Sequence, residues 1–142
     1  MKNQIKSAEF FLGGRAIFTV HNNVGEQYTY KIVKSKKSGL YFVSLLSGPN
    51  NETDYTYMGL LMPDLMQART TEKSLLNLSA PAFRVLNWAL KTVSQGKQIP
   101  FGYGIRHEGK CCVCALRLTD AESIETGIGP VCAKKMKGKK AA

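Results

Sequence analysis

Apolar and polar residues alternate along much of the first 61 positions of the chain. Alternation with a period of two is typical of strands that bury one face and expose the other. It predicts strands at about 15–21, 27–33, 41–46 and 54–61. Turn-forming or basic segments separate these runs. The first part of the chain is therefore expected to form an antiparallel β-meander.

A helical period replaces the alternation at 81–95. Phe83 and Leu86 recur there at a spacing that places apolar side chains on one face of a helix. Ser79 is a suitable N-cap, and Gly96 is suited to end the helix. One helix packed on four antiparallel strands predicts a small α+β fold.

Cysteine usage changes the picture for the C-terminal part. Cys111 and Cys114 form a Cys-x-x-Cys pair, His107 precedes the pair, and Cys132 follows after 17 intervening residues. Four such nitrogen and sulfur ligands fill a tetrahedral zinc shell and leave no coordination position open. We therefore predict a structural zinc site at His107, Cys111, Cys114 and Cys132, which argues against metal-dependent catalysis.

Other uses of these cysteines remain open. Two disulfides, a redox-active Cys-x-x-Cys pair and inert buried thiols are the alternatives. The redox use needs a βαβ context, whereas glycine-rich sequence precedes this pair. Cys112 is expected to be a packed small side chain or a spare thiol. His107 is the least secure ligand, and Cys112 or an external group could replace it.

The segment from His107 to Cys132 resembles a small, uncharacterised zinc-binding domain family that is frequent in phage and mobile-element proteins. The resemblance rests on the ligands, on Leu118-Thr-Asp and on the Gly127-Ile-Gly-Pro turn. Family members usually have Gly-Arg after the second cysteine, where this chain has Ala115-Leu. The resemblance implies a phage or prophage origin and a zinc knuckle, without an established activity.

The local physics of this segment agrees with a compact metal-binding module. Thr119 and Glu122 have the spacing of a capping box for a short helix over about 120–126. Gly127 is suited to end that helix, and Pro130 is suited to begin a last helix that presents Cys132. The glycine turn is expected to serve the metal site, although such a turn can also bind phosphate.

Three parts are therefore predicted. An α+β domain covers 1–98, with the meander at 8–62, a connector at 63–80 and the helix at 81–95. The zinc-binding module covers 99–136, and a basic tail covers 137–142.

The charge of the chain suggests a polyanionic partner. Lys and Arg number 20 against 10 Asp and Glu, for a formal net charge of +10. Lysine contacts to phosphates release counterions and favour nucleic-acid binding, although a lysine tail can also be merely solubilising. Aromatic side chains on a sheet, such as Tyr28 and Tyr30, can stack unpaired bases, although packing of these two tyrosines in the core is the plainer expectation. The predicted nucleic-acid-binding residues are Lys134, Lys135, Lys137, Lys139, Lys140, Lys34, Lys36, Lys37, Tyr28 and Tyr30.

Catalytic and membrane signals are lacking in the sequence. We find no phosphate-binding loop, dinucleotide fingerprint or nucleophile elbow, so we expect no enzyme activity and no small-molecule substrate. No window approaches the apolar length of a membrane helix. The charged first residues lack an apolar stretch behind them, so we expect no secretory signal and a cytoplasmic location in a bacterial host.

Two functional hypotheses follow. The first is a phage-type accessory protein that binds DNA or RNA and carries a structural zinc site. The second is a protein-interaction module of phage origin that binds and inhibits or redirects a host enzyme or defence complex, since a basic protein can also seek an acidic protein face.

Overall fold

The chain folds around one six-stranded antiparallel sheet, in the order β5-β4-β3-β2-β1-β6. The computed structural model describes residues 3–50 and 53–141, and for 136–141 it describes the helical backbone without the side chains. The strands are β1 (Arg15–His21), β2 (Gln27–Lys34), β3 (Tyr41–Leu46), β4 (Tyr55–Met62), β5 (Gln67–Arg69) and β6 (Gly104–His107). The α+β class is confirmed, and the four longest strands lie within one residue of the predicted bounds.

Two strands lie where the alternation predicted none. The three-residue β5 pairs with β4 through Leu61 and Ala68. The four-residue β6 pairs with β1, and Phe18 lies opposite His107. The first residues of the predicted zinc-binding module therefore belong to the main sheet.

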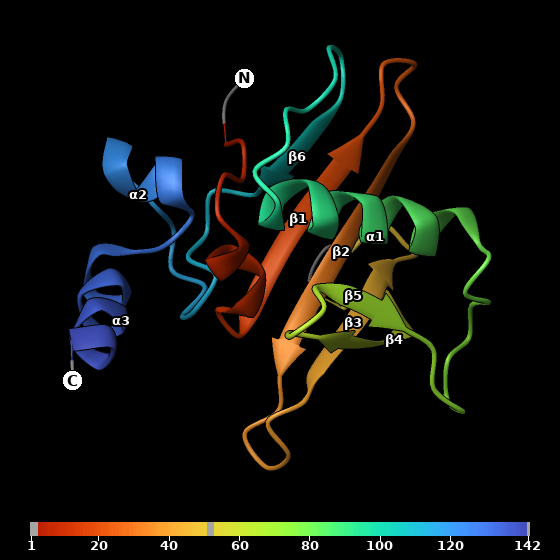
Figure 1. Ribbon diagram of the computed structural model, residues 1–142, viewed down its shortest axis with the longest axis horizontal. Coiled ribbons are helices and arrows are strands. Elements are labelled where there is room, and N and C mark those ends of the chain that lie inside the picture. Colours follow the sequence, from red (N-terminus) through yellow and green to blue (C-terminus); the bar gives the residue numbers. More distant parts are fainter. Residues whose placement is uncertain (1–2, 51–52, 142) are drawn as a thin grey trace.

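Helix α1 (Pro81–Ser94) and the short 3-10 helix η1 (Ala8–Leu12) cover one face of the sheet. The sheet curls, so that both β1 and β5 lie against α1 (Figure 1). The hydroxyl of Tyr30 on β2 donates a hydrogen bond to the carbonyl of Ala82 on α1 at 2.7 Å. On the same concave face, the rings of Phe11 and Phe18 pack edge to face with centroids 4.9 Å apart. The concave face holds the core.

The start of α1 differs from the sequence prediction. The N-cap is Ala80, which has no side chain to cap the helix, and Pro81 occupies the first turn. The hydroxyl of Ser79 instead hydrogen-bonds to the Asn77 side chain at 3.1 Å. Ser79 as the N-cap was therefore wrong, because its hydroxyl is engaged in the turn before the helix. Gly96 follows the helix in a left-handed conformation, with φ of 65°, as a helix end requires.

Helices α2 (Ala121–Thr126) and α3 (Pro130–Ala141) form the C-terminal part beside η1 and β6 (Figure 1). Both helices begin within one residue of their predicted starts. The backbone of α3 continues through 137–141, which had been expected as a separate tail. None of the helices in the described part of the chain is long and apolar enough to span a bilayer.

Candidate metal centre and basic face

A small hairpin builds the turn that carries Cys111 and Cys114. Lys110 and Arg117 pair across it, and the Cys111 N–H donates to the carbonyl of Leu116 at 2.8 Å. Ala115 closes the turn with a positive φ of 65°, and its N–H donates to the Cys111 carbonyl at 2.9 Å. This tight turn directs the two thiols to one side.

Helix α2 and the glycine turn after it bring the third thiol to the pair. Gly127 ends α2 in the left-handed region, with φ of 75°, and α3 then begins at Pro130 and presents Cys132 in its first turn. The N-cap of α2 is Asp120, whose carboxylate accepts from the Ser123 N–H at 3.1 Å. The predicted cap at Thr119 was therefore one residue too early.

The three sulfur atoms of Cys111, Cys114 and Cys132 lie within 4.8 Å of one another. Cys111 and Cys132 are buried, and Cys114 is half-buried. Zinc binds thiolates at about 2.3 Å in a tetrahedron, which places sulfur atoms about 3.8 Å apart. A slight contraction of the observed cluster would therefore suffice, and the three residues fit a thiophilic metal ion.

Hydrogen bonds around the cluster favour a thiolate at Cys111. Burial by itself would raise the pKa of this thiol, but backbone N–H groups of Cys114, Gly129 and Val113 bring the pKa below its usual value. The Val113 N–H lies 3.4 Å from the sulfur. Burial and the neighbouring thiols of Cys114 and Cys111 raise the pKa of Cys132 to about 12. A cation bound between these sulfur atoms would offset the repulsion between neighbouring thiolates.

His107 has other partners than the thiols. Its Nδ1 accepts from the Gly109 N–H at 2.9 Å, which leaves Nε2 to donate to the Ile124 carbonyl at 2.6 Å. Burial lowers the pKa of His107 despite that carbonyl, so the neutral imidazole is favoured. The structure brings together three of the four predicted ligands, and it does not bring His107 into the group. His107 as a ligand stays a prediction, and so does the closed shell.

Cys112 lies outside the thiol group and faces η1 instead. It is fully buried, and a Cβ placed on Gly13 would lie 2.5 Å from its sulfur. Burial and the nearby Cys111 raise the pKa of Cys112 to about 12. Its backbone accepts from the Arg15 N–H at 2.7 Å and donates to the Gly127 carbonyl at 3.0 Å. Cys112 is thus a packed residue that joins the cysteine turn to β1.

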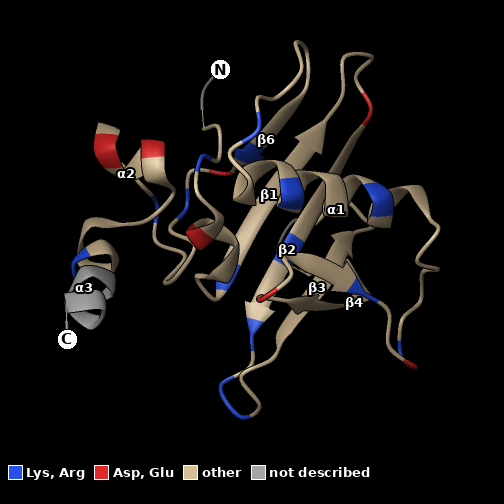
Figure 2. Ribbon diagram, in the orientation of Figure 1, with Lys and Arg blue, Asp and Glu red and all other residues tan. Residues whose placement is uncertain are grey.

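The predicted nucleic-acid-binding residues fall into three groups. Tyr30 is fully buried in the core, so its assignment to base stacking was wrong. Tyr28 is half-buried on the concave side. The exposed lysines occupy the β2–β3 region and the start of α3 (Figure 2), namely Lys34, Lys36, Lys37, Lys134 and Lys135. The side chains of Lys137, Lys139 and Lys140 lie outside the described part of the structure.

The opposite, outer face of the sheet carries a row of residues that the sequence did not single out. Arg15, Val33, Phe42, Leu60 and Arg69 are successive partners across five strands. The two arginines at its ends are exposed, and Phe42 is 37% exposed. We call these five residues the outer row. Strand alternation places such residues on one face, but the order of the strands decides which of them become neighbours.

Further aromatic and basic side chains adjoin the outer row. The rings of Phe42 and Tyr57 lie 6.2 Å apart. The ammonium group of Lys31 lies 4.9 Å from the ring centre of Tyr55. Burial and the charge of Glu108 raise the pKa of Tyr55 to about 12. The outer face therefore combines flat rings with cations, whereas the concave face is filled by the core.

Comparison with known proteins matches part of the chain to a family. A family of unknown function (DUF6011) matches residues 104–137, which span β6, the cysteine turn, α2 and most of α3. No curated protein matches the chain significantly, and no solved structure does. The matched region contains all three clustered cysteines, but the family description assigns no activity.

Proposed function

We propose that this protein is a non-enzymatic accessory protein that binds single-stranded nucleic acid across the outer face of its sheet. A structural zinc ion in the cluster of Cys111, Cys114 and Cys132 would hold the C-terminal helices in place. The outer row carries this proposal, because it sets an exposed aromatic ring between two exposed guanidinium groups. The phage origin and the bacterial cytoplasm implied by the sequence resemblance belong to the same proposal.

The chemistry of the outer row suits an unpaired strand. Aromatic side chains stack on bases of any sequence, and flanking cations follow the phosphates. Phe42 and Tyr57 provide the rings, and Arg15 and Arg69 provide the cations. Neither arginine forms a salt bridge within the described residues. Duplex DNA buries its base faces in the stack, so the rings favour a single strand.

The β2–β3 region adds further positive charge at one end of the sheet, beside the outer row. Lys36 and Lys37 are exposed in the loop, and Lys34 lies at the end of β2. Lys34 itself turns to the concave side, where its ammonium group lies 5.6 Å from the ring centre of Tyr41, whose hydroxyl donates to the Leu12 carbonyl. Figure 2 shows these positions together with the start of β1 along one end of the sheet. Lysines at this end would contact the phosphates of a nucleic-acid strand that extends beyond the outer row.

Zinc suits the sulfur-rich donor set of the cluster. Thiolates are soft ligands, and tetrahedral sites rich in sulfur select zinc or iron–sulfur chemistry. Val113 donates to one sulfur through its backbone N–H, which stabilises negative charge on that atom. The fourth position would be taken by His107 after rotation, or by an external ligand.

Binding is tested by fluorescence anisotropy with labelled single-stranded DNA, single-stranded RNA and duplex DNA at several salt concentrations. Phe42→Ala is expected to weaken single-strand binding by about 1–3 kcal/mol. Phe101→Ala is the matched control, because Phe101 is fully exposed in the loop between α1 and β6 and is not part of the outer row. Equal effects of the two substitutions, or no binding at low salt, would contradict the proposal.

The lysines are tested by charge reversal. Lys36→Glu with Lys37→Glu is expected to flatten the slope of log K against log salt by at least about 1.4, since each single-strand phosphate contact contributes about 0.7. Lys6→Glu with Lys97→Glu makes the same change of net charge at two exposed lysines near the end of α1, away from the outer row. Recovery of a nuclease-resistant protein partner, with no effect of either pair on nucleic acid, would favour the protein-interaction hypothesis instead.

A further inference from the structure

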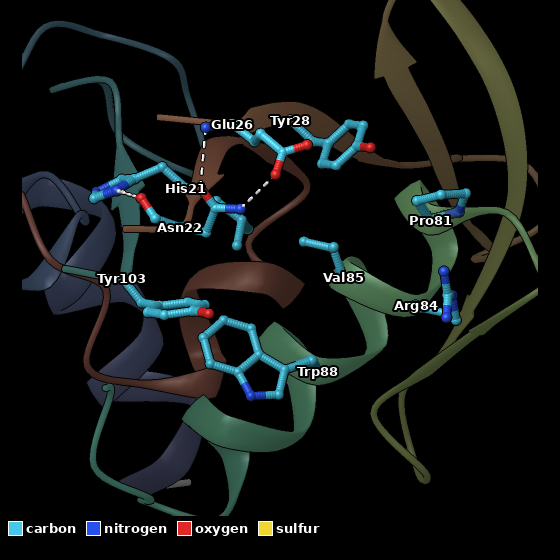
Figure 3. A pocket seen from close by; sticks show the side chains of 10 residues that line it. His21, Asn22, Glu26, Tyr28, Pro81, Arg84, Val85, Trp88 and Tyr103 are labelled. Atoms are coloured by element: carbon cyan, nitrogen blue, oxygen red, sulfur yellow. Dashed lines mark hydrogen bonds between the residues drawn. The ribbon is translucent and has the colours of Figure 1, made fainter. Parts of the chain in front are cut away.

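A cavity of about 430 Å³ lies between the β1–β2 hairpin and helix α1. Its volume is within the range of pockets that hold small ligands. Figure 3 shows Tyr28 and Glu26 on one side of it and Val85, Trp88 and Tyr103 on the other. The cavity lies at the hairpin end of β1 and β2, whereas Arg15 and Lys34 lie at their other end.

Aromatic side chains form much of the cavity wall. The rings of Trp88 and Tyr103 lie 5.8 Å apart, tilted by 58°. Tyr28 faces them across the space (Figure 3), and both Tyr28 and Trp88 are half-buried. Val85 adds an aliphatic surface between them. Such walls favour binding of a flat ring, because ring stacking and the burial of apolar surface both stabilise it in the cavity.

A carboxylate enters the cavity from the hairpin. One oxygen of Glu26 accepts from the Asn22 side-chain amide at 3.0 Å. The side-chain oxygen Oδ1 of Asn22 in turn accepts from the backbone N–H groups of Val24 and Glu26, so this turn holds the carboxylate in place. An ionised carboxylate has about four acceptor sites. Glu26 can therefore accept further N–H groups from a ligand.

A guanidinium group lies on another side of the same cavity. Arg84 projects from α1 and is exposed, and Figure 3 shows it apart from Glu26. The salt bridges of the described residues do not join the two. A cavity with an acceptor at one side and a cation at another suits a ligand with a donor edge and a negative group.

We infer that this cavity binds a guanine nucleotide, with the base between the aromatic walls, the base edge on Glu26 and the phosphate toward Arg84. Guanine presents two adjacent kinds of donor, N1–H and the 2-amino group, which match a carboxylate. Adenine and cytosine offer an amino group beside an acceptor, and uracil offers a single N–H. The ligand is either a free nucleotide or a guanosine within a strand, and the inference goes beyond binding at the outer row.

Trp88 provides a direct test, because it is the only tryptophan of the chain. Its fluorescence is titrated with the 5′-monophosphates of guanosine, adenosine, cytidine and uridine, and separately with short strands with and without guanosine. Saturable quenching by the guanosine nucleotide, with affinity at least tenfold above the others, is expected. Quenching by a guanosine-containing strand alone would place the base in a strand, and quenching by the monophosphate alone would identify a free nucleotide.

Variants separate the two ends of the ligand. Glu26→Gln keeps an acceptor for Asn22 but offers an amide donor toward the base, so the guanine preference is expected to fall at least tenfold. Glu72→Gln is the matched control at an exposed position in another loop. Arg84→Gln is expected to weaken the monophosphate several-fold and to leave unphosphorylated guanosine unchanged.

The outcomes also distinguish this inference from the proposed function. Equal quenching by all four nucleotides, no quenching, or quenching unaffected by Glu26→Gln overturns the cavity assignment, whatever the outer row does. Loss of strand binding in Phe42→Ala, with guanosine monophosphate binding retained, is expected for two separate sites.

Discussion

Replacing Cys112 or Cys114 of the cysteine turn by alanine should have opposite effects on zinc binding. Cys114 contributes its sulfur to the cluster and is half-buried. Cys112 lies outside the cluster and is fully buried against Gly13. Cys114→Ala should therefore remove a predicted metal ligand at small packing cost. Cys112→Ala should remove a packed atom without touching the predicted ligands.

The expected magnitudes separate the two variants. A metal ion present at 100 times its dissociation constant stabilises the folded state by about 2.7 kcal/mol. For a chain of this length, that corresponds to a melting temperature higher by roughly 5–10 °C. Cys114→Ala should lose most of this zinc-dependent increase. Cys112→Ala should keep it, and should lower stability by about 1 kcal/mol both with zinc and with chelator, as other losses of one buried heavy atom do.

The assay combines zinc per chain, by elemental mass spectrometry, with melting temperatures in zinc and in chelator. Wild type and Cys112→Ala should carry one zinc ion, and Cys114→Ala should carry much less. Cys132→Ala should behave as Cys114→Ala does. The three-thiol assignment is refuted if Cys112→Ala loses zinc and Cys114→Ala retains it. An unchanged zinc content in His107→Ala would exclude that side chain as the fourth ligand.

Three further predictions concern the fold. Tyr30→Phe removes the hydrogen bond to Ala82 at 2.7 Å and should cost about 1 kcal/mol in denaturant unfolding without altering nucleic-acid affinity. Gly127→Ala forces a side chain into φ of 75° and places its Cβ 2.6 Å from the Phe10 ring, so chemical denaturation should show a loss above about 1 kcal/mol. The pKa of Tyr55 is raised to about 12 and exceeds that of an unfolded tyrosine, so the stability should fall as pH rises from 10 to 12. In an absorbance titration at alkaline pH, Tyr55→Phe should lack one phenol group that ionises near pH 12.

The strands that sequence predicted are those whose signal is local. An alternation over six to eight residues marks the four long strands, because each buries one face. β5 and β6 have three and four residues, too few for a period to be distinguished. β6 forms because β1 offers a free edge, and the chain returns to it about 85 residues later. That pairing depends on tertiary structure and leaves no periodic trace.

The residues of the predicted metal site also differ in whether local spacing or tertiary structure sets their positions. Cys111 and Cys114 are brought together by a turn of four residues, and the Gly127-Ile-Gly-Pro segment fixes the start of α3, whose first turn carries Cys132. Spacing therefore predicted these three. The orientation of His107 depends instead on the Ile124 carbonyl, which α2 places within 2.6 Å of its ring. No sequence spacing could show that competitor for the imidazole.

Whether Tyr28 and Tyr30 lie on the buried or the exposed face of the sheet also depends on tertiary packing. Alternation places Tyr28 and Tyr30 on one side of β2, but only the packing of α1 on that side makes it the core. The opposite side carries Lys31 and Val33, and it becomes a continuous surface when β3 and β4 add Phe42 and Tyr57. The exposed rings of the sheet therefore lie on the face opposite Tyr28 and Tyr30.

Strand β1 connects the features to which we assign a function. At its start, the Arg15 N–H is held by the Cys112 carbonyl in the cysteine turn, while the side chain of Arg15 begins the outer row. At its end, Val20 and His21 border the aromatic cavity. A metal ion that orders the cysteine turn would therefore also fix the first cation of the outer row. The cavity lies at the far end of the same strand, about 20 Å away for a strand of this length, so it should be the least sensitive to loss of zinc.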